Sequence, residues 1–283
     1  MSGATTAADP VQRAIPNGYE ALPVIGLGTW QTFDVGTGAT ERAPLREVLR
    51  EFVALGGRVI DSSPMYGRSE RVVGDLTAEL GVRDKLFLAT KVWTSGRDAG
   101  IAQMQESLKL LRAERLDLMQ IHNLLDWRTH LTTLRAWKDQ GRIRYIGVTH
   151  YTEQAYDDLE HVLAREPVDF VQLNYSIAER DAEKRLLPLA AERRIGVLVN
   201  RPFAKSALFD RVRGKEVPAW AKEIGCATWA QYFLKFVVSH PAVTCALPAT
   251  SKVAHLRDNM QAGVGALPDA AMRERMAQYM TTL

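Results

Sequence analysis

Eight short apolar runs alternate along the chain with longer amphipathic segments, and this rhythm limits the folds that the chain can adopt. Between the runs, apolar residues recur at helical spacing, as Ile101, Met104, Leu108 and Leu111 do. Strands separated by a helix run parallel, because the chain must cross back before the next strand begins. The expected parallel strands are residues 24–27, 58–60, 86–90, 116–121, 143–148, 170–173, 196–199 and 243–247.

Eight strand–helix units in a chain of 283 residues agree in number and length with a closed (β/α)8 TIM barrel. The alternative is an open, doubly wound sheet, whose first turn normally carries a glycine-rich phosphate loop. Here Gly26-Leu27-Gly28 is followed by Thr29-Trp30-Gln31 without a third glycine, so that fingerprint fails. We therefore expect an α/β fold, a (β/α)8 TIM barrel that forms a single domain over residues 13–283.

Three further segments flank the expected barrel. Residues 1–12 are small and polar, which predicts a disordered N-terminus. The pair Asn17-Gly18 lies between two short apolar stretches and predicts an N-terminal hairpin. After Pro268, apolar residues at helical spacing predict an extra C-terminal helix.

The charge and the cysteine content argue against several classes of function. The net charge is +3, from 36 basic and 33 acidic residues, and the two signs are interspersed. No basic run exceeds a pair, so we expect neither a nucleic acid nor a membrane surface as a partner. Cys226 and Cys245 lie far apart and outside any CxxC motif, which predicts free thiols, a cytoplasmic protein and no metal site. A monomer is the default expectation for the quaternary structure.

Polar side chains follow three successive expected strands, at the point where each strand ends. Asp61 and Tyr66 follow the second strand, Lys91 the third and His122 the fourth. In a parallel barrel these strand ends meet at one rim, where the active sites of such barrels lie. We expect the ammonium of Lys91 to lower the pKa of the Tyr66 phenol, and Asp61 to keep Lys91 charged. The group suits proton donation to an oxygen atom that is gaining electrons.

These four residues, together with the segment 22–30 (Leu-Pro-Val-Ile-Gly-Leu-Gly-Thr-Trp), resemble the aldo-keto reductase family. The family's Asp-Tyr-Lys-His tetrad falls on Asp61, Tyr66, Lys91 and His122, and the resemblance extends to Asn259. It implies NADPH-dependent reduction of aldehydes or ketones, with Tyr66 as the general acid and His122 positioning the carbonyl. In such a reaction the nicotinamide supplies the hydride.

The resemblance also implies a set of residues that bind NADP, with NAD as the alternative. Gln172 matches the family's carboxamide-binding glutamine, whereas Thr149-His150 and Asn200 stand where the family usually has Ser-Asn and a stacking tyrosine. Arg201 is a candidate ligand of the pyrophosphate, because a guanidinium binds phosphate oxygens in pairs. The residues expected to bind the cofactor are Gly28, Thr29, Trp30, Asp61, Thr149, His150, Gln172, Asn200, Arg201, Pro202, Phe203, Thr250, Ser251, Lys252, Arg257 and Asn259.

The preference for NADP depends on the segment after the eighth expected strand. Ala249 and His255 stand where the family usually has a lysine and an arginine, while Lys252 and Arg257 lie nearby in the sequence. Lys252 and Arg257 are either phosphate ligands or ordinary exposed charges, and both interpretations stay open. Asn259 matches the family's adenine-contacting asparagine. For Phe203, packing under its loop is as good an interpretation as a cofactor contact.

Four aromatic residues behind strand ends, Trp30, Phe33, Trp93 and Trp127, are expected to wall a pocket for a small-molecule carbonyl substrate. The loop after the fourth strand is short, and the C-terminal substrate flap of longer relatives is not expected, so we predict an open and permissive site. Two other functions stay open at this point. A Schiff-base aldolase would also use a barrel lysine, here Lys91. A non-catalytic barrel would bind a nicotinamide nucleotide without turning it over.

Overall fold

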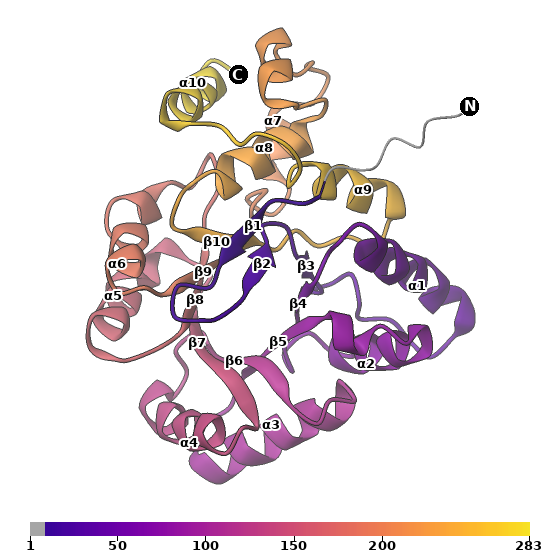
Figure 1. Cartoon of the computed structure of the whole chain (residues 1–283), viewed down its shortest axis with the longest axis vertical. Coiled ribbons are helices and arrows are strands. Elements are labelled where there is room, and N and C mark those ends of the chain that lie inside the picture. Colours follow the sequence, from indigo (N-terminus) through magenta and orange to yellow (C-terminus); the bar gives the residue numbers. More distant parts are fainter. Residues whose placement is uncertain (1–8) are drawn as a thin grey trace.

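The computed structural model describes residues 9–283, which form eight parallel strands surrounded by helices (Figure 1). Each strand pairs with its neighbours in chain order, so the sheet curves round into a barrel. The predicted (β/α)8 barrel is thereby confirmed. The strands are β3 (Leu27–Gly28), β4 (Val59–Asp61), β5 (Phe87–Val92), β6 (Leu116–His122), β7 (Ile143–Thr149), β8 (Phe170–Asn174), β9 (Gly196–Asn200) and β10 (Val243–Ala246).

The barrel closes where β10 meets the segment around β3. β3 has only two residues, which is shorter than the strand predicted at residues 24–27 and shifted toward its end. Isolated parallel bridges join Ile25 to Ala246 and Gly28 to Ala249, and the amide of Gly26 donates to Ala246 O at 2.8 Å. We call this sparsely paired junction, residues 24–28 with residues 246–249, the seam.

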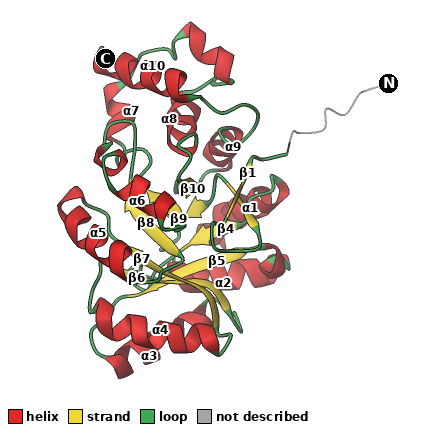
Figure 2. Ribbon diagram, turned by 60° about the vertical axis from the view of Figure 1, so that its left-hand side comes forward, coloured by secondary structure: helices red, strands yellow, loops and turns green. Residues whose placement is uncertain are grey.

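Helices cover the outside of the strands (Figure 2). In α1 (Ala39–Ala54), the buried residues Leu45, Val48, Leu49 and Phe52 form one stripe, as expected of an amphipathic helix that packs on a sheet. The other helices are α2 (Ser69–Leu80), α3 (Arg97–Leu110), α4 (Trp127–Asp139), α5 (Tyr156–Arg165), α6 (Leu186–Glu192), α7 (Ala207–Arg211), α8 (Trp229–Val238), α9 (Val253–Gln261) and α10 (Ala270–Thr281).

The predicted N-terminal hairpin is present and closes one end of the barrel. β1 (Gln12–Ala14) and β2 (Ala21–Pro23) pair antiparallel. Ile15 and Leu22 from this hairpin belong to a buried apolar cluster that also contains the first residues of β5 and β8. The hairpin therefore plugs the end of the barrel where the strands begin, and the open end is the one where they finish.

Part of the expected N-terminal disorder is contradicted. Residues 1–8 lie outside the described residues, but residues 10–12 make backbone pairings with other segments. Pro10 forms a bridge with Val264, and Gln12 begins β1, so the ordered chain starts before residue 13. The small, polar composition of the segment gave no sign of these backbone pairings.

The C-terminal half contains the predicted additional helix and the predicted free thiols. α10 lies beyond α8, outside the ring of helices that covers the barrel (Figure 1). Cys226 and Cys245 are both buried and unbridged. Among residues 9–283, no helix has both the length and the apolar character that crossing a bilayer requires.

Candidate active site

The four predicted catalytic side chains lie together where β4, β5 and β6 end. Asp61 ends β4, His122 ends β6, and Lys91 is the last residue but one of β5. Lys91 is fully buried, and its Nζ donates to Asp61 Oδ2 at 2.6 Å and to Ser62 O at 2.7 Å. The same Nζ lies 4.9 Å from the centre of the Tyr66 ring. The strand ends therefore assemble one cluster, as the sequence predicts.

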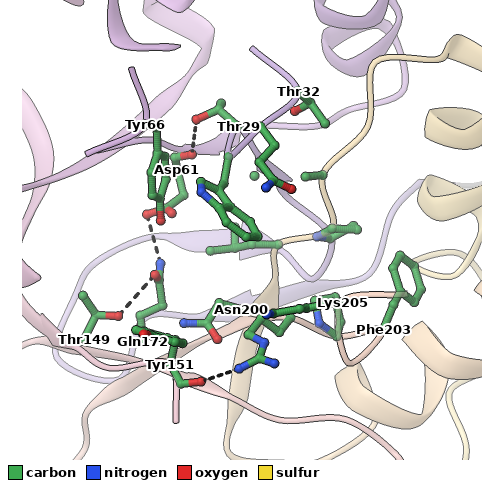
Figure 3. A pocket seen from close by; sticks show the side chains of 18 of the residues that line it. Thr29, Thr32, Asp61, Tyr66, Thr149, Tyr151, Gln172, Asn200, Phe203 and Lys205 are labelled. Atoms are coloured by element: carbon green, nitrogen blue, oxygen red, sulfur yellow. Dashed lines mark hydrogen bonds between the residues drawn. The ribbon is translucent and has the colours of Figure 1, made fainter. Parts of the chain in front are cut away.

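Asp61 is held as a buried acceptor of several hydrogen bonds. Gln120 and Gln172 each donate an amide N–H to Asp61 Oδ1, at 3.0 and 2.9 Å (Figure 3 shows the bond from Gln172). With Lys91 at Oδ2, three donors compensate for the removal of the carboxylate from water. Sequence reasoning missed Gln120, although a polar residue within the apolar run of β6 is a signal that could have found it.

Tyr66 lies in the turn after β4, and its pKa departs from the expected direction. Burial raises the pKa of the Tyr66 phenol above its ordinary value, and this effect outweighs the opposing attraction of the Lys91 ammonium. Lys91 does lower that pKa, as predicted, but the net pKa shift is upward, because the sequence could not show how completely the ring is buried. A phenol with a raised pKa is protonated at neutral pH, which is the state that a proton donor needs.

His122 is a neutral imidazole beside Tyr66. Burial, followed by the nearby Lys91 ammonium, lowers the pKa of His122 to about 3. Its ring meets the Tyr66 ring edge to face, with centroids 5.8 Å apart. His122 Nδ1 is hydrogen bonded to Ser63 Oγ at 2.9 Å, so Nδ1 is engaged within the protein.

A cavity of about 630 Å3 lies at this open end of the barrel, and Tyr66 and His122 are part of its wall. Figure 3 shows Tyr66 in this wall. The volume of the cavity is in the range of small-molecule and cofactor sites. The loops after β3, β9 and β10 supply most of the remaining wall. The predicted cofactor residues that line it are Gly28, Thr29, Trp30, Asp61, Thr149, Gln172, Asn200, Arg201, Pro202 and Phe203.

Four buried polar atoms of wall residues lack a hydrogen-bond partner within the described part of the chain. They are Thr32 Oγ1, Asn123 Oδ1, Asn200 Oδ1 and Arg201 Nε. Buried polar groups are normally paired, so unpaired ones gathered round a cavity indicate a place for a polar ligand.

Comparisons with known proteins agree with this geometry. The sequence profile described as "Aldo/keto reductase family" matches residues 24–277. The chain is 30% identical over 253 residues to methylglyoxal reductase YeaE of Escherichia coli, an alignment that covers 86% of each protein. The chain belongs to the aldo-keto reductase family. As a member, it is an NAD(P)H-dependent oxidoreductase.

Solved aldo-keto reductases share the fold along nearly the whole chain. The structure of an aldo/keto reductase from Klebsiella pneumoniae in complex with NADP and acetate has a TM-score of 0.77 at 25% identity, and 92% of each chain is covered. A second Klebsiella pneumoniae aldo-keto reductase, in complex with NADPH, has a TM-score of 0.76 at 25% identity, with 97% of this chain and 96% of that chain covered.

Several residues that the family resemblance implied lie outside the wall of the cavity. His150 instead stacks on Tyr151, with ring centroids 5.5 Å apart, and Tyr151 lines the cavity. Arg257 forms an exposed ion pair with Glu51 at 2.7 Å. Asn259 is buried in α9. The remaining three, Thr250, Ser251 and Lys252, directly follow Ala249, which does line the cavity, and their contact with a cofactor stays a prediction.

The aromatic walls of this aldo-keto reductase are only partly as predicted. Trp30 lines the cavity. Trp93 does not line it, although its ring lies 6.3 Å from the His122 ring. The prediction that Phe33 lines the wall is wrong, because its ring is completely buried in the hydrophobic core. Trp127 is also wrong, because it begins α4 and packs against the core rather than lining the cavity.

The wall also contains residues that sequence reasoning did not select. Lys205 and Ser206 follow Phe203 in the loop after β9, and Asn123 directly follows His122. Lys205 could have been predicted from the sequence, because it is a basic residue in the same loop as Arg201. Within residues 9–283, no group of His, Cys, Asp and Glu side chains could hold a metal ion.

Proposed function

We propose that the chain reduces aldehydes or ketones to alcohols with NADPH, and that Tyr66 is the general acid. One observation carries the proposal: the buried Lys91–Asp61 ion pair lies beside the Tyr66 phenol, which shares a cavity wall with a neutral His122. This is the arrangement that proton donation to a carbonyl oxygen needs.

The residues of the cavity fit a nicotinamide dinucleotide. Arg201 and Lys205 place two cations on the loop after β9, which suits an anionic pyrophosphate. Thr149 and Gln172 are bonded to each other at 3.3 Å and offer polar atoms to a carboxamide. When bound there, the cofactor supplies the hydride. The Klebsiella pneumoniae structures hold NADP or NADPH, which favours NADP over NAD for this chain.

Proton transfer follows from the positions of the tetrad. The carbonyl oxygen of a substrate would accept hydrogen bonds from Tyr66 Oη and from the His122 ring. As negative charge develops on that oxygen, the proton passes from Tyr66 Oη, and the Lys91 ammonium stabilises the resulting phenolate. Asp61 keeps Lys91 charged and in place from 2.6 Å. Burial makes these interactions stronger than they would be in water.

The Schiff-base aldolase alternative finds no support. An aldolase lysine needs a neutral amine that can attack a carbonyl. Burial alone would lower the pKa of Lys91, but the attraction of the Asp61 carboxylate raises it above its ordinary value. A lysine held charged in this way is a poor nucleophile.

We propose small aldehydes, including 2-oxoaldehydes, as substrates. The E. coli relative is named a methylglyoxal reductase, and the two proteins align over most of their length. Trp30, Met65, Trp93 and Leu125 leave large apolar surfaces exposed near the tetrad, which suits a permissive, apolar entrance. Similar kcat/KM values for aldehydes of very different bulk would support an open site, and strong selectivity for one large substrate would contradict it.

The decisive experiment measures NADPH oxidation with a panel of aldehydes by wild type and Tyr66→Phe. We expect turnover by the wild type and a loss of about 10²- to 10⁴-fold in kcat for the variant, the range for removal of a general acid. Fluorescence titration with NADPH should give the same Kd for both proteins. Tight NADPH binding without turnover by the wild type would instead indicate the non-catalytic barrel, and unchanged turnover by Tyr66→Phe would remove Tyr66 from its role.

We also propose that the protein is a cytoplasmic monomer that acts on free small molecules. The interspersed charges support the absence of a nucleic-acid partner. Size-exclusion chromatography with light scattering checks the monomer, and a mass of twice 31.6 kDa would contradict it.

A further inference from the structure

Ser63 lies beneath His122 in the turn that leaves β4, and its side chain has no exposed surface. Its Oγ makes two hydrogen bonds. One joins it to His122 Nδ1 at 2.9 Å, and in the other it accepts the backbone N–H of Met65 at 3.2 Å. Ser63 has no part in the tetrad, yet it is the only residue of residues 9–283 that is hydrogen bonded to the His122 ring.

Counting hydrogen atoms decides the direction of the bond to His122. A hydroxyl carries one hydrogen and two lone pairs. One lone pair of Ser63 Oγ takes the Met65 N–H, and no other described residue accepts the hydroxyl hydrogen. If His122 donated from Nδ1, that hydrogen would be left buried and unpaired, which is costly. The arrangement that pairs every group has Ser63 donating to an unprotonated Nδ1.

A neutral imidazole with an unprotonated Nδ1 carries its hydrogen on Nε2. Nε2 is the ring atom without a partner among the described residues, and His122 lines the cavity. We propose that Ser63 is a positioning residue that fixes His122 in the Nε2–H tautomer, so that the imidazole donates a hydrogen bond to the substrate carbonyl. The inference rests on the proposed carbonyl reduction for its purpose, but the tautomer itself is a property of the protein alone.

The tautomer matters because both groups around the carbonyl oxygen must be donors. Tyr66 Oη supplies one hydrogen and His122 Nε2 the other. In the opposite tautomer, an Nε2 lone pair would face the lone pairs of the carbonyl oxygen, and the substrate would be repelled. Donors placed ahead of time where charge develops are a principal source of catalysis.

Nitrogen NMR of 15N-histidine-labelled protein tests the tautomer without any substrate. The chain has six histidines, and the His122 signals are those absent from a His122→Gln variant. We expect a protonated Nε2 and an unprotonated Nδ1 in the wild type, and a mixture of tautomers in Ser63→Ala. Ser62→Ala is the matched control, because Ser62 is equally buried and adjacent but bonds to Thr29, so the His122 signals should not change.

Kinetics supply the second readout. Ser63→Ala should lower kcat by about 10- to 100-fold, less than the ~10²- to 10³-fold cost of deleting an oxyanion donor, because the variant keeps the imidazole. The Kd for NADPH should stay unchanged, and Ser63→Thr, which keeps the hydroxyl, should recover most of kcat. A protonated Nδ1 in the wild type would overturn the inference, whether or not Ser63→Ala folds. So would a Ser63→Ala protein that folds, by circular dichroism, with the tautomer and kcat of the wild type.

The two proposals fail in different ways. Absence of carbonyl reduction by the wild type would defeat the proposed function, while the NMR spectrum would still decide the tautomer. Carbonyl reduction together with an Nδ1–H tautomer would leave the function standing and remove the role of Ser63.

Discussion

Lys91→Met removes one member of an ion pair that is almost completely inaccessible to water. The side chains of Lys91 and Asp61 are 0% and 6% exposed, and the Asp61 carboxylate would remain in place without its cation. Breaking a buried pair costs about 3–5 kcal/mol. We expect a loss near ~3 kcal/mol, the low end of that range, because Gln120 and Gln172 still donate to Asp61. Asp61→Asn should cost about as much, since it leaves the Lys91 ammonium facing an amide.

The double variant Asp61→Asn/Lys91→Met should lose about 3 kcal/mol rather than about 6, because the second change removes the charge that the first left unpaired. The coupling free energy of the cycle is then about 3 kcal/mol. A typical domain has ~5–15 kcal/mol of stability, so all three variants should fold. Urea unfolding followed by tryptophan fluorescence measures each value.

Lys235→Met is the matched control for this cycle. Lys235 is as buried as Lys91, but its Nζ donates to the carbonyls of Val264 and Ala266 and has no carboxylate partner. In the double variant Asp61→Asn/Lys235→Met, the losses in the free energy of unfolding of the two single variants should add. The reasoning would be refuted if the two losses in Asp61→Asn/Lys91→Met also added, since the pair would then not behave as one electrostatic unit.

Three further outcomes are expected. From about pH 6 to pH 9, kcat/KM for reduction should be level. The raised pKa of Tyr66 keeps the acid protonated, and the pKa of His122, about 3, lies below this range. A fall of kcat/KM through neutral pH would contradict both pKa assignments. Arg257→Ala should cost less than about 1 kcal/mol, since its ion pair with Glu51 is exposed, and should leave KM for NADPH and NADH unchanged, since Arg257 lies outside the cavity wall; a rise in KM for NADPH alone would show a phosphate contact. Gly74→Ala places a Cβ 2.0 Å from Leu110 O, so α2 and α3 must move apart. The variant should lose about 1–3 kcal/mol of stability, and an unchanged Tm would show that the two helices separate without cost.

The barrel and the tetrad were predictable because their signals are local. An apolar run that ends in a polar residue is visible in a few letters of sequence, and parallel topology then brings such ends to one rim. The directions of the loops were not predictable. Gln31, Asn123, Leu124 and Asp126 all have positive φ angles, which non-glycine residues rarely adopt and which sequence does not announce. These turns precede the two misplaced aromatics, Phe33 and Trp127.

The strength of competing effects was equally hidden. The sequence shows that Lys91 and Tyr66 can be neighbours, but the sign of the Tyr66 pKa shift depends on how much burial opposes the charge. The ion pair of Arg257 was hidden as well, because its partner Glu51 lies in α1, far away in the sequence. Contacts of this kind depend on tertiary structure, and only the folded chain reveals them.

We expect the seam to form late as this barrel folds. Its two sides come from opposite ends of the chain, and they are joined by isolated bridges rather than by a long ladder. Contacts between distant parts of a chain form late, because the entropy of closing a long loop must be overcome first. Gly28 on one side and Pro248 and Ala249 on the other both line the cavity. A ligand that touches both sides stabilises the closed ring by mass action. We therefore expect a ligand in the active site to oppose the opening of the barrel at the seam.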